Sequence, residues 1–127
     1  MVMDGSENRA KRRVLIVEDD ASNRRALERA LRSVGFDVDL AACVQEGLAK
    51  MAGQVVALVD LGLPGGLGTT LLEEMRARGF RMPVAIISGN PDALSIIRVA
   101  NARPDVFFEK PVNLEQLLAW IEWRTSS

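Results

Sequence analysis

Polar residues that suit phosphate chemistry follow short apolar runs, at the points where predicted strands end. They are the acidic run Glu18-Asp19-Asp20, then Asp60, Ser88 and Lys110. Carboxylates can hold a divalent cation or accept a phosphoryl group, a hydroxyl can donate to a phosphoryl oxygen, and an ammonium can pair with its charge. Together these residues indicate transfer of a phosphoryl group onto an aspartate, so we expect a phosphorylation switch.

The three adjacent carboxylates of the acidic run repel one another unless a cation or a helix start relieves them. Mg²⁺ would do so, bound through a few carboxylates, a backbone carbonyl and water. An acidic first turn favoured by the helix dipole explains the same residues. The run alone therefore leaves both interpretations open.

Asp60 opens the glycine-rich segment 60–68, whose backbone can bend closely around a small ligand. Phosphoryl transfer to a carboxylate needs little acid–base chemistry when a metal ion offsets charge, so the lack of histidine is no obstacle. Asp60 can equally be a turn residue, Ser88 a cap, and Lys110 a surface lysine. Lysine is scarce, however, with three against thirteen arginines, which favours a specific role for Lys110.

The elements that must position these residues alternate along the chain. Four apolar runs are typical of strands buried on both faces: residues 14–17, 55–59, 84–87 and 106–108. A weaker run at 38–42 predicts a fifth strand. Helices are expected between them, including 44–51, 69–78 and 92–102. This alternation predicts a doubly wound five-stranded parallel sheet with five helices, in which ligands bind beyond the carboxyl ends of the strands.

Two helices have clear apolar stripes. The first places Leu27, Ala30, Leu31 and Val34 at helical spacing and ends near Gly35; the last places Leu114, Leu117, Leu118 and Ile121 inward, with Asn113 as N-cap and Gln116 as its partner.

The composition fits one domain of 127 residues, which we divide into a flexible arm at 1–13, the domain at 14–124 and a tail at 125–127. The net charge of -1 gives no general attraction to nucleic acid or membrane. A single cysteine cannot form an internal disulfide, no apolar run is long enough to span a bilayer, and the charged first residues do not resemble a secretory signal. We therefore expect a cytoplasmic protein.

Four motifs together resemble those of response-regulator receiver domains of two-component signalling. They cover most of residues 14–123 and read VLIVEDD, VDLGLPGGLG, IISG and FEKP. The resemblance implies a flavodoxin-like sheet of order 2-1-3-4-5. It also implies that the protein is a signalling switch and not an enzyme with a separate substrate.

The resemblance assigns a role to each site residue. Asp60 would be the phosphoacceptor, and Mg²⁺ would be bound by Asp19 and Asp60 directly, by Glu18 through water and by the backbone carbonyl of Gly62. Ser88 would follow the phosphoryl group, Lys110 would pair with it, and the Lys110–Pro111 bond would be cis.

Four positions limit what can be transferred from the family. Ser88 stands where threonine is commoner, and Phe107, at the switch-aromatic position, has no hydroxyl to exchange a hydrogen bond. Gly62 and Asn90 occupy places that influence how water reaches the acyl phosphate, and Gly62 can neither shield it nor position an attacking water.

Two surfaces are candidates for partner contacts. Arg25, Arg29 and Arg32 lie opposite the first helix's apolar stripe, either as a solvated face with a Glu28–Arg32 pair or as a docking site for a phosphohistidine donor. Trp120 lies on the flank of the last helix and Trp123 faces outward. They suggest a homodimer or partner contact, unless the C-terminus frays and Trp123 folds back on its own helix.

The sequence thus predicts a receiver that takes a phosphoryl group from a sensor histidine kinase or a histidine phosphotransfer protein, without binding nucleic acid or a membrane. Rival interpretations are a phosphorelay intermediate or phosphate sink without its own output, a constitutive pseudo-receiver, and a magnesium-dependent phosphatase with an aspartyl nucleophile.

Overall fold

A five-stranded parallel sheet forms the centre of the molecule. The computed structural model describes residues 12–89 and 92–126. Asn90 and all but the last two residues of the predicted arm lie outside the described residues. The sheet has the order β2-β1-β3-β6-β7, which confirms the predicted 2-1-3-4-5 arrangement. Its strands agree with the predicted runs to within one residue at each end: β1 Arg13–Val17, β2 Asp37–Ala41, β3 Gln54–Asp60, β6 Val84–Ser88 and β7 Val106–Glu109.

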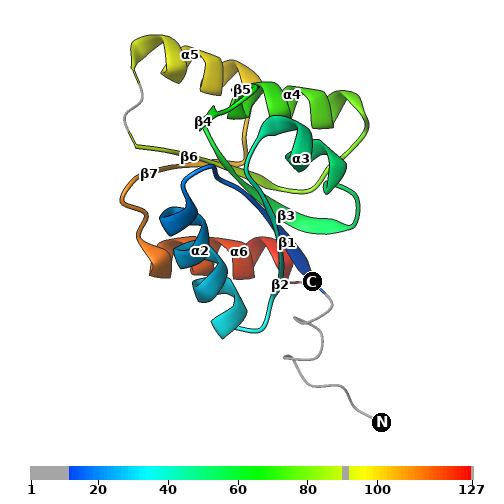
Figure 1. The fold of residues 1–127 in the computed structure, drawn as a ribbon, viewed down its shortest axis with the longest axis vertical. Coiled ribbons are helices and arrows are strands. Elements are labelled where there is room, and N and C mark those ends of the chain that lie inside the picture. The colour runs from blue at the N-terminus through cyan, green and yellow to red at the C-terminus, as the bar shows by residue number, and fades with distance from the viewer. Residues whose placement is uncertain (1–11, 90–91, 127) are drawn as a thin grey trace.

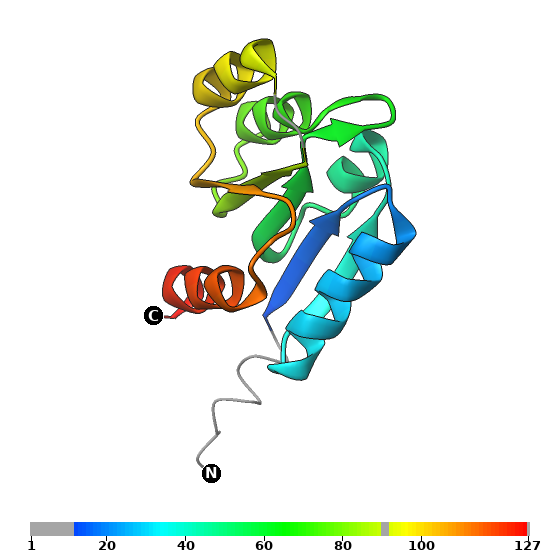
Figure 2. The ribbon, with the colours of Figure 1, turned by 90° about the vertical axis from the view of Figure 1, so that its left-hand side faces the viewer.

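Helices cover both faces of this sheet (Figures 1 and 2). On one face lie α2 and α6; on the other lie α3, α4 and α5. Their bounds are α2 Ala21–Ser33, α3 Val44–Ala49, α4 Gly68–Ala77, α5 Ala93–Ala102 and α6 Leu114–Thr125. None of the helices in the described part of the chain is long and apolar enough to cross a membrane.

The central strands have no solvent-facing side, which explains their unbroken apolar sequences. In β1 the side chains of Leu15 and Val17 join the core under α3 and α4, whereas Val14 and Ile16 join the core under α2 and α6. Because side chains alternate along a strand, a run of four apolar residues fills both cores at once.

Side-chain caps mark the starts of α2 and α6. At the start of α2 the Asp20 carboxylate accepts a hydrogen bond from Asn23 N–H at 2.9 Å, and after its end Gly35 takes a φ of 96° that suits glycine. At the start of α6 the Asn113 side chain accepts from Gln116 N–H at 3.0 Å, as predicted.

Two details of the predicted helices are wrong. Leu114, expected to face inward, is 40% exposed, because it lies in the first turn of α6 beside an open cavity rather than over the sheet. The predicted helix 44–51 is shorter in the structure, ending at Ala49.

The glycine-rich segment after β3 contains a small hairpin that the sequence pattern did not predict. Gly62–Leu63 (β4) pairs antiparallel with Gly66–Leu67 (β5). Two-residue strands are too short to show a period. Gly65, with φ of 84°, makes the turn after Pro64 that brings them together.

Candidate functional site

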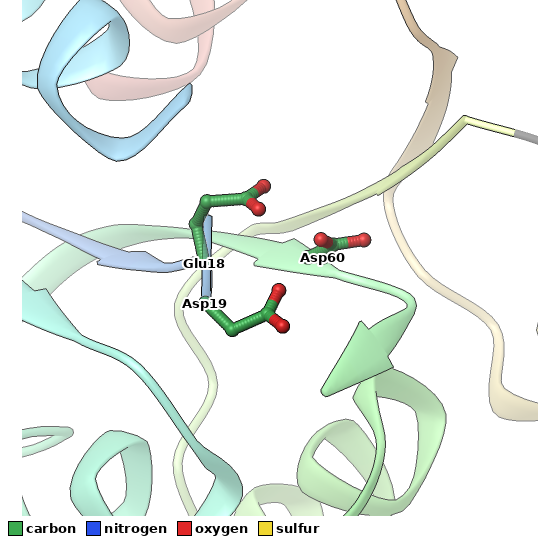
Figure 3. Close-up of side chains that lie close together, drawn as sticks. All are labelled: Glu18, Asp19 and Asp60. Atoms are coloured by element: carbon green, nitrogen blue, oxygen red, sulfur yellow. The ribbon is translucent and has the colours of Figure 1, made fainter. Parts of the chain in front are cut away.

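Three carboxylates meet at the carboxyl end of the sheet (Figure 3). One oxygen each from Glu18, Asp19 and Asp60 lies within 4.8 Å of the others. Glu18 and Asp19 follow β1, whereas Asp60 is the last residue of the neighbouring strand β3. Adjacent parallel strands thus place residues about forty positions apart around one small volume, with Asp19 exposed and the other two buried.

Lys110 approaches the same volume from the loop after β7. Its Nζ donates to Glu18 Oε2 at 3.0 Å and to Asp60 Oδ2 at 3.1 Å. The main chain holds it there, because Lys110 N–H donates to the Ser88 carbonyl at 2.8 Å. The Lys110–Pro111 bond is cis, as the resemblance implied.

Asp60 is fixed from the glycine-rich segment. Gly62 N–H donates to Asp60 Oδ1 at 3.3 Å, so each carboxylate oxygen has a donor. Gly68, the first residue of α4, packs so closely that an added Cβ would lie 2.3 Å from the Asp60 carbonyl oxygen. Only glycine fits at this position, and its absence of a side chain lets α4 begin directly behind the candidate acceptor.

Ser88 and Phe107 lie on the two strands farther along the sheet. Ser88 is buried at the end of β6 and pairs in register with Glu109, the residue before Lys110. Phe107 is half-buried on β7 and packs against the core under α4 and α5. The structure therefore brings Glu18, Asp19, Asp60 and Lys110 into direct proximity and places Ser88 beside them, with Phe107 farther out.

The electrostatics of the site favour an added positive charge. Burial raises the pKa of Glu18 above its ordinary value, and the hydrogen bond from Lys110 only partly offsets this. Partial burial opposes charging of Lys110, but its hydrogen bonds to Glu18 and Asp60 prevail and raise the pKa of the ammonium. Lys110 stays charged at neutral pH, and its single ammonium contacts two of the three carboxylates, Glu18 and Asp60.

The donor set fits Mg²⁺. This ion prefers carboxylate and carbonyl oxygens, retains several waters and is held by one or two carboxylates at a time. Asp19 is exposed and Asp60 adjoins it, while both oxygens of Glu18 already accept hydrogen bonds, from Asp20 N–H at 3.1 Å and from Lys110. This arrangement is compatible with direct ligation by the two aspartates and a more distant role for Glu18.

An open cavity of about 440 Å³ adjoins the site between α2 and the start of α6. Glu18 and Lys110 form its polar end, and the rest is mainly apolar, lined by Asn23, Ala26, Leu27, Ile87, Pro111, Val112 and Leu114. The exposed arginines of α2 stand on the same helix. Of these, Arg32 pairs with Glu28 at 3.0 Å, as predicted.

A second hollow of about 350 Å³ lies between α5 and β7, with Phe107 and Glu109 on the strand side. The neighbouring surface of α5 is apolar, because Leu94, Ile96 and Ile97 are each more than half exposed. Of the described α5 side chains, Val99 alone is buried. This face is thus distinct from the cavity at the acidic site.

The two tryptophans differ in their surroundings. Trp120 packs against the core, and its ring meets Phe108 edge-on at 6.3 Å. Trp123 is 70% exposed, as predicted. The helix continues past Trp123 to Thr125, so the end does not fray before it, and the Arg124 guanidinium lies over both rings, at 5.9 and 5.7 Å.

One residue near the site had no sequence signal. Arg24 Nη1 donates to the Glu18 carbonyl at 2.8 Å and reaches the Asp19 carbonyl at 3.4 Å. An arginine on a helix among several others is not distinguished by type or spacing. A contact to main-chain carbonyls becomes visible only in three dimensions.

Comparisons with known proteins agree on one family. Residues 14–122 match the family model described as "Response regulator receiver domain". The chain is 30% identical over 111 residues to the cell cycle transcriptional regulator CtrA of Caulobacter vibrioides, covering 86% of this chain and 48% of that protein. It is 29% identical over 109 residues to the transcriptional regulatory protein PhoP of Escherichia coli, covering 84% and 49%. The chain thus spans about half the length of these curated relatives.

Solved structures give the same result. A CheY-like receiver domain protein from Methanospirillum hungatei superposes with a TM-score of 0.82 and 33% identity, covering 89% of this chain and 92% of that one. A two-component response regulator from Clostridium difficile gives 0.82 and 26%, covering 89% and 94%.

Proposed function

The chain belongs to the response-regulator receiver domain family, and we propose that it accepts a phosphoryl group on Asp60 and signals by a change of conformation. The observation that carries this proposal is the arrangement around Asp60. Its carboxylate adjoins Glu18 and Asp19 within 4.8 Å and has the Lys110 ammonium at 3.1 Å.

The donor in this proposal is a phosphohistidine of a sensor kinase or of a histidine phosphotransfer protein. A carboxylate oxygen of Asp60 attacks phosphorus, an acyl-phosphate P–O bond forms, and the P–N bond to the histidine breaks. The electron pair of that bond stays on the imidazole nitrogen: the ring leaves as neutral imidazole if its other nitrogen carries a proton, and otherwise it takes a proton from solvent. The cavity between α2 and α6 is where we place the donor, and the exposed arginines stand on the same helix α2.

Mg²⁺ bound at this site would supply positive charge that stabilises the phosphoryl oxygens during transfer. Asp19 and Asp60 would hold it directly, Glu18 through water, and the Gly62 carbonyl would complete the protein ligands. Lys110 would exchange its hydrogen bond with Asp60 for one with a phosphoryl oxygen, and the Ser88 hydroxyl would donate to another.

The signal would then pass along β6 and β7. Ser88 pairs in register with Glu109, and the Lys110 amide donates to the Ser88 carbonyl. Movement of Ser88 would therefore displace the end of β7. Phe107 lies two residues before Glu109, in the wall of the hollow beside α5. Phosphorylation would bias an existing equilibrium of this face, by packing of the Phe107 ring and not by a hydroxyl bond.

The partners follow from this assignment. We propose that residues 14–124 form the functional receiver and that it acts in the cytoplasm. We also propose that Trp120 and Trp123 on α6 belong to a homodimer contact. We propose no contact between residues 14–124 and nucleic acid or a membrane. The names of the transcriptional regulators above refer to proteins about twice as long.

The test is the intact mass of the protein after incubation with Mg²⁺ and acetyl phosphate. We expect one added phosphoryl group in the wild type, none without Mg²⁺ and none in Asp60→Asn. Asp92→Asn is the matched control, since Asp92 is an exposed N-cap of α5 and asparagine caps a helix equally well. Addition to Asp60→Asn would refute the assignment. Rapid transfer of the phosphoryl group from Asp60 back to a histidine donor, with no change at the α5 face, would favour the phosphorelay or phosphate-sink interpretation.

A further inference from the structure

Arg24 closes over the turn that leads from β1 into α2. Its Nη1 donates to the Glu18 carbonyl at 2.8 Å, in a partly buried position, and reaches the Asp19 carbonyl at 3.4 Å. Neither of these bonds goes to a carboxylate. The guanidinium thus binds the main-chain carbonyls of Glu18 and Asp19, the two residues whose carboxylates lie near that of Asp60.

The other restraints on this turn act on different groups. Glu18 N–H donates to the Ala41 carbonyl at 2.9 Å, and Asp20 N–H donates to Glu18 Oε1 at 3.1 Å. Both contacts use N–H groups on either side of the Glu18–Asp19 peptide. The bond from Arg24 is made to the carbonyl of that peptide itself. A net change in the ψ angle of Glu18 or the φ angle of Asp19 would redirect the two side chains. The bond from Arg24 to the carbonyl between them opposes that change, in addition to the bond from Lys110 Nζ to Glu18 Oε2 at 3.0 Å.

We propose that Arg24 is a positioning residue for the metal site: by holding the Glu18 carbonyl, it keeps the Glu18 and Asp19 carboxylates directed toward Asp60 before any cation binds. This inference rests on the proposed function. Groups that orient metal ligands without binding the metal themselves commonly control metal affinity. A guanidinium can donate hydrogen bonds to two neighbouring carbonyls at once.

The direction of the change in Mg²⁺ affinity distinguishes a positioning role of Arg24 from a purely electrostatic one. A positive side chain beside a cation site repels the cation, so deleting charge alone would strengthen Mg²⁺ binding. Deleting a residue that orients the ligands would weaken it. Arg25 provides the matched control, because it carries the same charge on the next residue and is exposed.

The experiment is a calorimetric titration with Mg²⁺ of the wild type, Arg24→Ala, Arg24→Lys and Arg25→Ala. We expect Arg24→Ala to bind about tenfold more weakly, Arg24→Lys to lie between it and the wild type, and Arg25→Ala to match the wild type or bind more tightly. In metal-free protein, backbone amide NMR signals of residues 18–20 are expected to move in Arg24→Ala and to stay in place in Arg25→Ala.

The outcomes are distinguishable from failure of the proposed function. A wild type that does not bind Mg²⁺ refutes the function, and the positioning role with it. A wild type that binds, with Arg24→Ala equal to or tighter than Arg25→Ala, overturns the positioning role alone. If Arg24→Ala does not fold, Arg24→Gln replaces it and is judged against Arg25→Ala by the same comparison.

Discussion

Lys110 Nζ lies 3.1 Å from Asp60 Oδ2, although fifty residues separate them in the chain. The same ammonium lies 3.0 Å from the buried Glu18 carboxylate. Before any phosphoryl group arrives, Lys110 therefore stands where a cation is needed and offsets part of the repulsion among the acids.

Removal of this ammonium is expected to destabilise the metal-free protein. Lys110→Ala leaves Glu18 buried with one oxygen unpaired, so we expect a loss of about 1–3 kcal/mol in the free energy of unfolding. Urea unfolding in the presence of EDTA measures it. Added Mg²⁺ should recover part of the loss, because a ligand that binds only the folded state stabilises it. Lys50→Ala, on an exposed side chain, is the control, and an equal loss in both variants would contradict the prediction.

Gly62, the first residue of β4, and Gly68, the residue after β5, are expected to tolerate substitution by alanine very differently. At Gly68 an added Cβ would lie 2.3 Å from the Asp60 carbonyl oxygen, so Gly68→Ala must displace α4 or β3 and should cost about 3 kcal/mol or prevent folding. At Gly62 an added Cβ meets nothing within 4 Å, so Gly62→Ala should change stability by no more than about 0.5 kcal/mol. Urea unfolding of both variants compares them; similar costs would show that the close packing at Gly68 is not limiting.

Acid should weaken the edge of the sheet at Asp39. Hydrogen bonds from Arg13 lower the pKa of this carboxyl from the ordinary 3.8 to about 2. A lowered pKa means that the unfolded chain binds the proton first, so the contribution is complete above about pH 4 and is lost as the pH falls toward about 2. Because the pair is partly exposed, we expect on the order of 1 kcal/mol. Urea midpoints across this range should fall less steeply in Asp39→Asn than in the wild type.

Tryptophan fluorescence should report the state of β7. The Trp120 ring meets Phe108 edge-on at 6.3 Å, and Phe108 adjoins the candidate switch residue Phe107. If phosphorylation moves β7, the emission of Trp120 should change when acetyl phosphate and Mg²⁺ are added. The change should persist in Trp123→Phe and vanish in Trp120→Phe and Asp60→Asn. A signal that follows Trp123 instead would locate the movement at the exposed end of α6.

Most of the fold could be predicted because its signals are local. Unbroken apolar runs mark strands buried on both faces, and Asn113 marks the start of α6. The hairpin β4–β5 was missed because two-residue strands have no period, and Leu114 was misplaced because helical spacing does not show where the neighbouring layer ends.

The site could be predicted in part for a related reason. Glu18 follows β1, Asp60 ends β3 and Lys110 follows β7, and a parallel sheet places the carboxyl ends of its strands at one edge. Arg24 could not be predicted, because its partner is a main-chain carbonyl that every residue carries. The roles of the brought-together residues stay predictions that the experiments above decide.

The ten-residue helix α5 is secured by one buried side chain, Val99, among those described. Helices in proteins gain most of their stability from tertiary packing, and α5 has little of it. Local unfolding of α5 should therefore cost little free energy. Its amide hydrogens should exchange with solvent through local opening, whereas those of β1 and β3 should exchange only when the whole domain unfolds. We therefore expect the molecule to have two levels of stability: a rigid sheet that holds the acids, and a helix that can unfold and refold separately at small energetic cost.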